Sequence, residues 1–131
     1  MKINSKNRKK FYLKIHLIFC VKYRKKLLIN GLENIVINNI NNISQDKNFN
    51  IDEINSDENH IHMLISYEPQ ISVTSIVRFL KQKSTIHLWK TQYILLKNVF
   101  YKEKTFWSDG YFVCSVGHNN EKIITEYINN Q

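Results

Sequence analysis

The chain has 131 residues, of which 43% are hydrophobic and 12% aromatic, with three glycines and one proline. This length and composition predict a single folded domain over residues 1–131 and exclude an intrinsically disordered chain. The formal net charge of +8 favours polyanionic partners, nucleic acid first and anionic membrane second, although a generally basic soluble surface would give the same charge.

The sequence contains no signal for a membrane or a secretory pathway. No apolar stretch approaches the ~20 residues of a membrane-spanning helix, and residues 11–21 are interrupted by Lys14 and His16, which argues against a signal peptide. Cys20 and Cys114 are far apart and form no CxxC pattern. We therefore expect reduced thiols in a cytoplasmic protein rather than disulfides or a zinc knuckle.

The first half of the chain alternates between strand and helix patterns. Residues 1–10 are polar and basic, which predicts a flexible arm, and the aromatic and β-branched run 11–22 predicts a first strand. Apolar residues then recur every three or four positions over 32–43, the spacing of an amphipathic helix. A second strand is expected over residues 49–55 and a third over 59–66, paired as a hairpin.

The second half continues with helical spacing. Ser72 is a suitable N-cap for a second helix, and the pattern extends to Leu96, either as the same helix or after a break. The remaining predicted elements are a basic loop, a turn, a fourth strand and a last helix that Asn119 or Asn120 can cap, over residues 97–104, 107–110, 111–116 and 121–131.

The order is therefore strand, helix, strand, strand, helix, strand, helix. The first six elements match a ferredoxin-like split β-α-β unit, an α+β fold with an antiparallel sheet and helices on one face. The seventh is an additional C-terminal helix.

The predicted third strand contains two histidines separated by one isoleucine. Residues two apart in a strand face the same way, so His60 and His62 should project side by side while Ile61, Met63 and Ile65 enter the core. Two imidazoles on one rigid face can bind a metal ion. A His-x-His pair in a strand also occurs by chance, so the pair alone does not establish a metal site.

Two basic clusters are candidate DNA contacts. The first mixes cations with an aromatic ring directly after the first strand, which suits phosphate contacts and base stacking, although a solvated strand end would look the same. The second is a basic stripe on the second helix. The residues are Lys22, Tyr23, Arg24 and Lys25 in the first cluster and Arg78, Lys81 and Lys83 in the second.

The last helix carries two polar groups inside its apolar face. Tyr127 and Gln131 lie one turn apart on the arc that Ile123, Ile124 and Ile128 define. A helix that only closes a core would be expected to hold apolar side chains there. A core tyrosine and a frayed terminus are the simpler interpretations of each residue alone, but both together with the histidine pair indicate a site.

From about Phe11 to Gln131 the chain resembles the single-tyrosine transposases of small bacterial insertion sequences (TnpA-type). These enzymes belong to the HUH nucleases, named for histidine, hydrophobic residue, histidine. The motifs that carry the resemblance are, in chain order, Lys22-Tyr23-Arg24, His60-Ile61-His62, Trp107, Gly110-Tyr111-Phe112, Val116-Gly117 and Tyr127-Ile128 followed by Gln131.

The resemblance implies a metal-dependent DNA transposase that cleaves and rejoins single-stranded DNA at insertion-sequence ends. It implies that Tyr127 is the nucleophile of a 5′-phosphotyrosine intermediate, and that His60, His62 and Gln131 hold one divalent ion, Mg²⁺ or Mn²⁺. It also implies DNA with hairpin ends as substrate, a bacterial or archaeal cytoplasm, and a homodimer. There the tyrosine helix can complete the partner's histidine pair, with Gly117 as hinge.

The chain departs from the family pattern at two positions. Asn59 stands where relatives often carry the aspartate that would orient the first histidine, and Gln82 stands where many have glycine. His16, His87 and His118 have no partner spacing and receive no role. Two other interpretations stay open: an inactive or domesticated relative that binds DNA hairpins without cutting, and an RNA-recognition module, which would need aromatic residues on the central strands.

Overall fold

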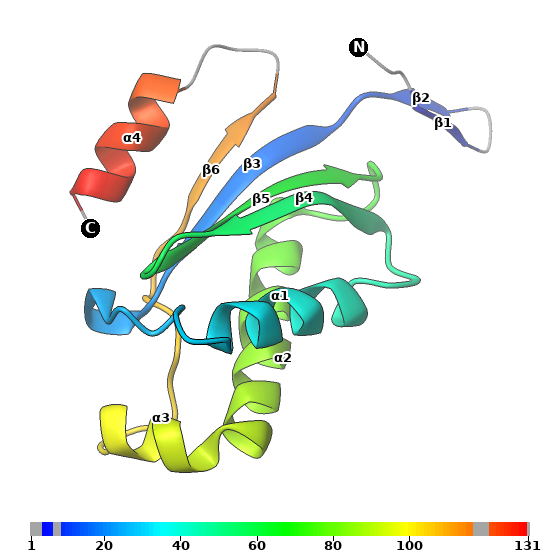
Figure 1. Cartoon of the computed structure of the whole chain (residues 1–131). Helices are drawn as coiled ribbons and strands as arrows, with labels where there is room; N and C mark the ends of the chain where they lie inside the picture. Colours follow the sequence, from blue (N-terminus) through cyan, green and yellow to red (C-terminus); the bar gives the residue numbers. More distant parts are fainter. Residues whose placement is uncertain (1–3, 7–8, 117–120, 131) are drawn as a thin grey trace.

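The structure is a computed structural model that describes residues 4–6, 9–116 and 121–130. Its helices and strands are β1 Asn4–Lys6, β2 Lys9–Phe11, β3 Lys14–Cys20, the 3₁₀ turn η1 Lys22–Arg24, α1 Leu32–Ile43, β4 Phe49–Ser56, β5 His60–Tyr67, α2 Val73–Thr91, α3 Tyr93–Val99, β6 Phe112–Ser115 and α4 Glu121–Asn129. Figure 1 shows α1 and α2 on one face of the main sheet and α4 on the other, beside β6.

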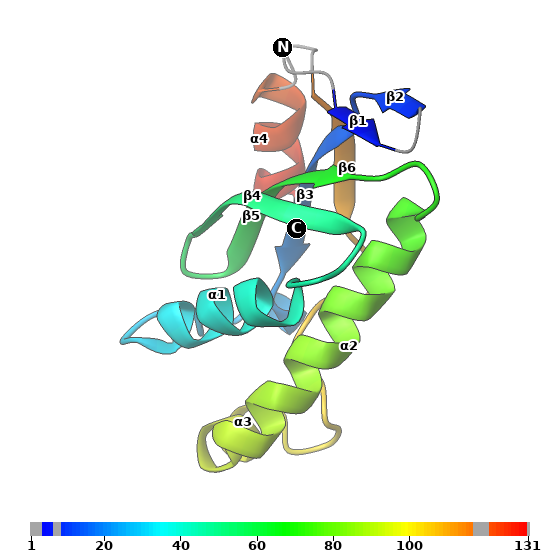
Figure 2. The same ribbon diagram turned by 90° about the vertical axis from the view of Figure 1, so that its right-hand side faces the viewer.

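The main sheet has four strands in the spatial order β4-β5-β3-β6. All neighbouring pairs are antiparallel. The two strands that come first and third in the main sheet along the chain, β3 and β5, are therefore its centre, as in a ferredoxin-like fold. The predicted α+β class is confirmed, and so is the placement of α1 and α2 together on one face, which Figure 2 shows from the side.

The amino-terminal segment differs from the prediction. The sequence predicts a flexible arm over residues 1–10, whereas β1 and β2 pair as a small separate sheet, from Asn4↔Phe11 to Lys6↔Lys9. Backbone hydrogen bonds between two short polar strands leave no apolar periodicity in the sequence. The long predicted strand over residues 11–22 consequently begins later, at Lys14.

The helix patterns are confirmed where they are local. Within α1, Val36 and Ile40 are fully buried, as the three-and-four spacing predicts. Ser72 caps α2, because its Oγ accepts a hydrogen bond from the Ser75 backbone N–H at 3.1 Å. The continuous helical pattern is broken at Gln92, whose backbone leaves the helical region, so α3 is a separate helix that turns away from α2.

The two faces of the sheet have different characters. Leu17, Phe19, Ile61, Met63 and Ile65 are fully buried under α1 and α2, so the alternation predicted for the histidine strand is confirmed. The opposite face carries the residues between them. In the described part of the chain, no helix is long and apolar enough to span a membrane.

Candidate functional site

His60 and His62 project from the face of the sheet that α1 and α2 leave uncovered. His60 is 8% exposed, and His62 is half-buried. Burial lowers the pKa of both imidazoles, and for His62 the neighbouring His16 and His60 lower it further. Both rings are therefore held in the neutral form, which is the form that binds metal ions.

Asn59 orients the first histidine. The His60 Nδ1 lies 2.9 Å from the Asn59 Oδ1. Because an amide oxygen only accepts, Nδ1 carries the proton and Nε2 keeps its lone pair. A neutral amide thus occupies the place of the carboxylate that often supports a metal-binding histidine.

His16 is a histidine that sequence reasoning left without a role. Its Nδ1 lies 3.0 Å from the His62 Nε2, although the two residues are 46 positions apart, and the ring centroids are 5.1 Å apart. The contact depends on the pairing of β3 with β5, in which Ile18 is opposite His62 and His16 is opposite Leu64. Only a known strand register could have revealed it.

Tyr127 reaches the same face of the sheet from α4. Its ring stacks on Phe112 with a centroid distance of 5.1 Å and an interplanar angle of 37°. Phe112 is paired with Ile18, and Ile18 with His62. Neighbouring strands are about 4.8 Å apart, so the His62 and Phe112 backbones, which are two strands apart, are separated by about 10 Å in total.

The carboxyl end of α4 is tied to η1. Arg24 Nη2 donates to the Ile128 carbonyl oxygen at 3.3 Å, which places a cation at the negative end of the helix dipole. The predicted apolar arc is only partly covered, because Ile123 is 53% exposed. Gln131, Gly117, Asn119 and Asn120 lie outside the described residues, and so do their predicted roles.

The environment of Tyr127 keeps its phenol protonated. Burial raises the pKa of Tyr127, and the nearby Cys20 raises it further. Burial also raises the pKa of the Cys20 thiol, although Arg24 and Lys81 oppose the shift. A nucleophilic role for this phenol therefore requires that the proton leave during attack.

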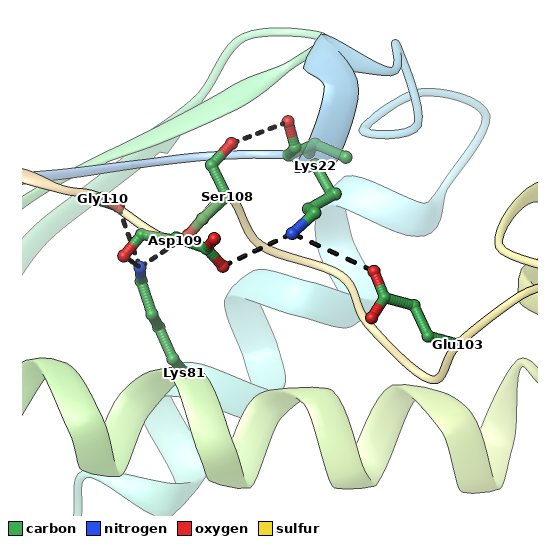
Figure 3. A network of polar contacts seen from close by, with 7 residues as sticks. Lys22, Lys81, Glu103, Ser108, Asp109 and Gly110 are labelled. Carbon is green, nitrogen blue, oxygen red and sulfur yellow. Dashed lines mark hydrogen bonds and ion pairs between the residues drawn. The ribbon is translucent and has the colours of Figure 1, made fainter.

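Of the residues predicted to bind DNA, Lys22 and Lys81 make internal contacts (Figure 3). Lys81 Nζ donates to the backbone carbonyls of Ser108, Asp109 and Gly110 at 2.7, 3.1 and 2.8 Å. Lys22 Nζ lies 3.4 Å from Asp109 Oδ1 and 4.0 Å from Glu103 Oε1. Burial lowers the pKa of Lys81, and its three N–H donors are used to hold the loop that leads into β6.

The other basic and aromatic residues are exposed. Tyr23 is 70% exposed and Tyr101 is 77% exposed, and both line a cleft of about 320 Å³ together with Lys25 and Lys102. Tyr101 and Lys102 were not singled out in the sequence, where residues 97–104 are predicted only as a basic loop. Arg78 and Lys83 are exposed on α2, on the opposite side of the sheet from the histidines.

The backbone of η1 is unusual. Tyr23 and Arg24 have φ values of 59° and 53°, in the left-handed region that non-glycine residues rarely adopt. The turn sends three neighbouring side chains in different directions: Lys22 to the loop 103–109, Tyr23 to solvent and Arg24 to α4. The backbone N–H of Val21 donates to the Asn59 carbonyl at 2.9 Å, so this turn lies next to the histidine strand.

The two central strands show no aromatic platform on the histidine face. Between Lys14 and Ser66, alternation places His16, Ile18 and Cys20 of β3 beside the histidines and Leu64 of β5 on this face. None of these residues is Phe, Tyr or Trp. The feature that an RNA-recognition module would need is therefore missing from these described strands.

A comparison with protein families decides the class of the chain. The family described as "Transposase IS200 like" matches residues 9–131. The chain belongs to this transposase family. It is therefore an enzyme of DNA transposition, a process that cuts and rejoins DNA, and the resemblance inferred from the motifs is confirmed.

Relatives of known identity agree. The IS200 transposase of Salmonella typhimurium is 36% identical over 118 residues, which are 90% of this chain and 76% of that protein. The ISDra2 transposase TnpA of Deinococcus radiodurans is 26% identical over 121 residues, or 92% of this chain and 85% of the relative.

Two solved structures share the fold of this transposase. A transposase from Deinococcus radiodurans superposes with a TM-score of 0.85 at 23% identity, covering 100% of this chain and 98% of the other. A REP-associated tyrosine transposase bound to a REP hairpin gives a TM-score of 0.59 at 16% identity, covering 96% of this chain and 72% of the other. Both confirm the α+β architecture.

Proposed function

We propose that this transposase cleaves and rejoins single-stranded DNA at insertion-sequence ends through a 5′-phosphotyrosine at Tyr127, with a divalent metal ion at His60, His62 and Gln131. The observation that carries the proposal is the row that runs across the sheet. Tyr127 stacks on Phe112, and the strand pairs Phe112–Ile18 and Ile18–His62 continue the row to the histidine pair.

The proposed reaction exchanges one ester for another. The Tyr127 phenol oxygen forms a bond to phosphorus as the bond from phosphorus to the 3′ oxygen breaks. The phenol loses its proton, and the leaving 3′ oxygen gains one. Because the number of phosphoester bonds is unchanged, the step needs no ATP and runs backwards to rejoin strands.

The residues at the site fit a divalent ion by their chemistry. The proposed donors, which the family resemblance implies, are the two imidazoles and the Gln131 amide oxygen. In the described part of the chain, no three His, Cys, Asp or Glu side chains form a metal-binding group. Burial keeps both imidazoles neutral, and these donors suit Mn²⁺ or Mg²⁺. When bound, the ion supplies a Lewis acid for a non-bridging phosphate oxygen.

The proposed substrate is single-stranded DNA with hairpin ends. The exposed rings of Tyr23 and Tyr101 beside Lys25 offer base stacking and phosphate contacts in one cleft. Arg24, which stands between Tyr23 and Lys25 in the sequence, donates a hydrogen bond to α4. Lys22 and Lys81 support the proposal indirectly, because they fix the loop that leads into β6, whereas Arg78 and Lys83 are available for DNA on α2.

The experiment is covalent trapping on a hairpin-bearing, single-stranded oligonucleotide labelled on the 3′ side of the cleavage site. With Mn²⁺, the wild type should give a protein–DNA adduct that survives denaturing electrophoresis. Tyr127→Phe should abolish the adduct, and Tyr93→Phe, at an exposed tyrosine on α3, should not. An adduct of equal amount in Tyr127→Phe would overturn the proposal, and hairpin binding without any adduct would favour a DNA-binding relative that does not cut.

A homodimer is part of the proposal, and mixing variants assigns its active sites. Tyr127→Phe and His62→Ala are each expected to be inactive alone. If the tyrosine helix serves the partner subunit, mixed dimers contain one intact site and activity returns; if each chain uses its own helix, the mixture stays inactive. In the single chain of the structure, α4 contacts Phe112 and Arg24, and the mixing experiment decides which subunit's histidine pair Tyr127 serves.

A further inference from the structure

We propose that His16 is a positioning residue for the metal site: its Nδ1 accepts a hydrogen bond from the His62 Nε2–H and leaves the His62 Nδ1 lone pair open to the ion. This inference deepens the proposed function and rests on the metal-binding role given there to His62. The two ring nitrogens are 3.0 Å apart.

If His62 binds the ion, as proposed above, counting protons gives the direction of this hydrogen bond. A neutral imidazole has one N–H and one lone pair. If His16 donated, the His62 Nε2 lone pair would be used and its Nδ1 would carry the proton, so His62 would have nothing to offer a cation. If His62 donates, its Nδ1 lone pair is open while the bond to His16 stays intact.

The same logic already holds for the other histidine. His60 donates its Nδ1–H to the Asn59 Oδ1 at 2.9 Å and keeps the Nε2 lone pair. Each imidazole of the pair thus has one ring nitrogen in a protein hydrogen bond, and the proposal assigns the other nitrogen to the ion. Histidines that bind metal ions typically use one ring nitrogen for the ion and the other for a hydrogen bond to the protein.

The strands make the contact a fixed one. His16 lies on β3 and His62 on β5, the two central strands, and seven consecutive residue pairs join them from Lys14↔Ser66 to Cys20↔His60. Ile18, which is opposite His62 and two residues from His16 on the same face, is fully buried. Both rings are therefore carried by the paired backbones of the two central strands.

The competing assignment makes His16 itself a ligand of the ion. Against it, His16, His60 and His62 do not form a three-residue metal-binding group in the described structure. The hydrogen-bond role needs only the observed contact. The number of imidazoles at the bound ion separates the two assignments.

The test uses the full chain without DNA and compares His16→Leu with His16→Asn, whose amide oxygen can still accept. His87→Gln on α2 is the control. In the metal-free wild type, ¹⁵N imidazole spectra should show the His62 proton on Nε2; His16→Leu should lose this preference. Calorimetric Mn²⁺ affinity should fall about 10- to 100-fold in His16→Leu, be largely restored in His16→Asn, and be unchanged in His87→Gln.

Three outcomes would overturn the inference: a His62 proton on Nδ1 in the metal-free wild type, equal Mn²⁺ affinity in His16→Leu and wild type, or the loss of one imidazole nitrogen from the pulsed EPR spectrum of bound Mn²⁺ in His16→Leu. Circular dichroism of both variants checks folding. None of these measurements involves Tyr127, so a missing DNA adduct beside reduced Mn²⁺ affinity in His16→Leu rejects the proposed function alone. An adduct with unchanged affinity rejects the His16 role alone.

Discussion

The Tyr127 ring lies on the Phe112 ring, 5.1 Å from centroid to centroid. This contact and the Arg24 hydrogen bond to Ile128 hold α4 to the rest of the chain, while Ile123 on the same helix is 53% exposed. The position of the proposed nucleophile therefore depends in part on an aromatic contact with the edge strand β6.

Replacing Phe112 by leucine should slow formation of the tyrosyl–DNA adduct by up to about tenfold, because an aromatic pair contributes about 0.5–1.5 kcal/mol beyond its buried area. Single-turnover trapping measures the rate. Val113→Ala, one position along β6 on the other face, should change the rate little. Equal rates for Phe112→Leu and wild type would mean that the stacking does not position Tyr127.

Replacing Lys81 by methionine should free the loop 108–110. The ammonium group donates to three carbonyls there, and losing such charged hydrogen bonds costs about 1–3 kcal/mol of unfolding free energy. Urea denaturation measures the loss, and faster hydrogen exchange at the Ser108 amide locates it. Lys83→Met, exposed on the same helix, is the control; an equal effect in both variants would contradict the role of Lys81.

The metal-free protein should lose stability as the pH falls. The pKa values of His60 and His62 are lowered in the folded chain, so below the ordinary histidine pKa of about 6.5 the unfolded chain binds more protons than the folded one. The free energy of unfolding should therefore decrease on acidification through that range until the folded histidines also protonate.

Urea titrations between pH 7.5 and 5 with a chelator present measure this dependence. His62→Gln should flatten the curve, because one of the two shifted groups is gone. The same slope in wild type and His62→Gln would show that burial of this imidazole does not contribute.

Asn39 should be a site for stabilisation. It is 6% exposed on α1, and its Oδ1 is buried without a hydrogen-bond partner in the described structure. Asn39→Leu should raise the free energy of unfolding by about 1–2 kcal/mol, because the unpaired amide is removed and apolar area is buried. Asn38→Leu, at the exposed preceding position, reports the change in helix propensity alone; an equal gain there would contradict the explanation.

Local patterns predicted the elements that local forces determine. The spacing over α1, the Ser72 cap and the alternation around His60 and His62 each depend on residues a few positions apart, and the structure confirms them. The break at Gln92 has no glycine or proline to mark it, so the periodicity left open whether one helix or two extend to Leu96, and the structure shows two.

The parts of the site that depend on register could not be predicted. The contact of His16 with His62 depends on the alignment of β3 with β5. The hydrogen bonds from Lys81 to three backbone carbonyls depend on the path of a loop that is 27–29 residues away in the sequence. The sequence alone does not distinguish a lysine or a lone histidine that faces solvent from one that contacts another part of the protein.

The left-handed turn at Tyr23 and Arg24 has a mechanical consequence. Such backbone is costly for residues with a Cβ and persists only while its surroundings hold it. Two interactions hold the turn: Lys22 forms an ion pair with Asp109 in the neighbouring loop, and Arg24 donates a hydrogen bond to the end of α4. A force on the exposed Tyr23 ring is therefore transmitted to both the loop at Asp109 and the end of α4. A ligand that binds this ring would thus also act on the helix that carries Tyr127.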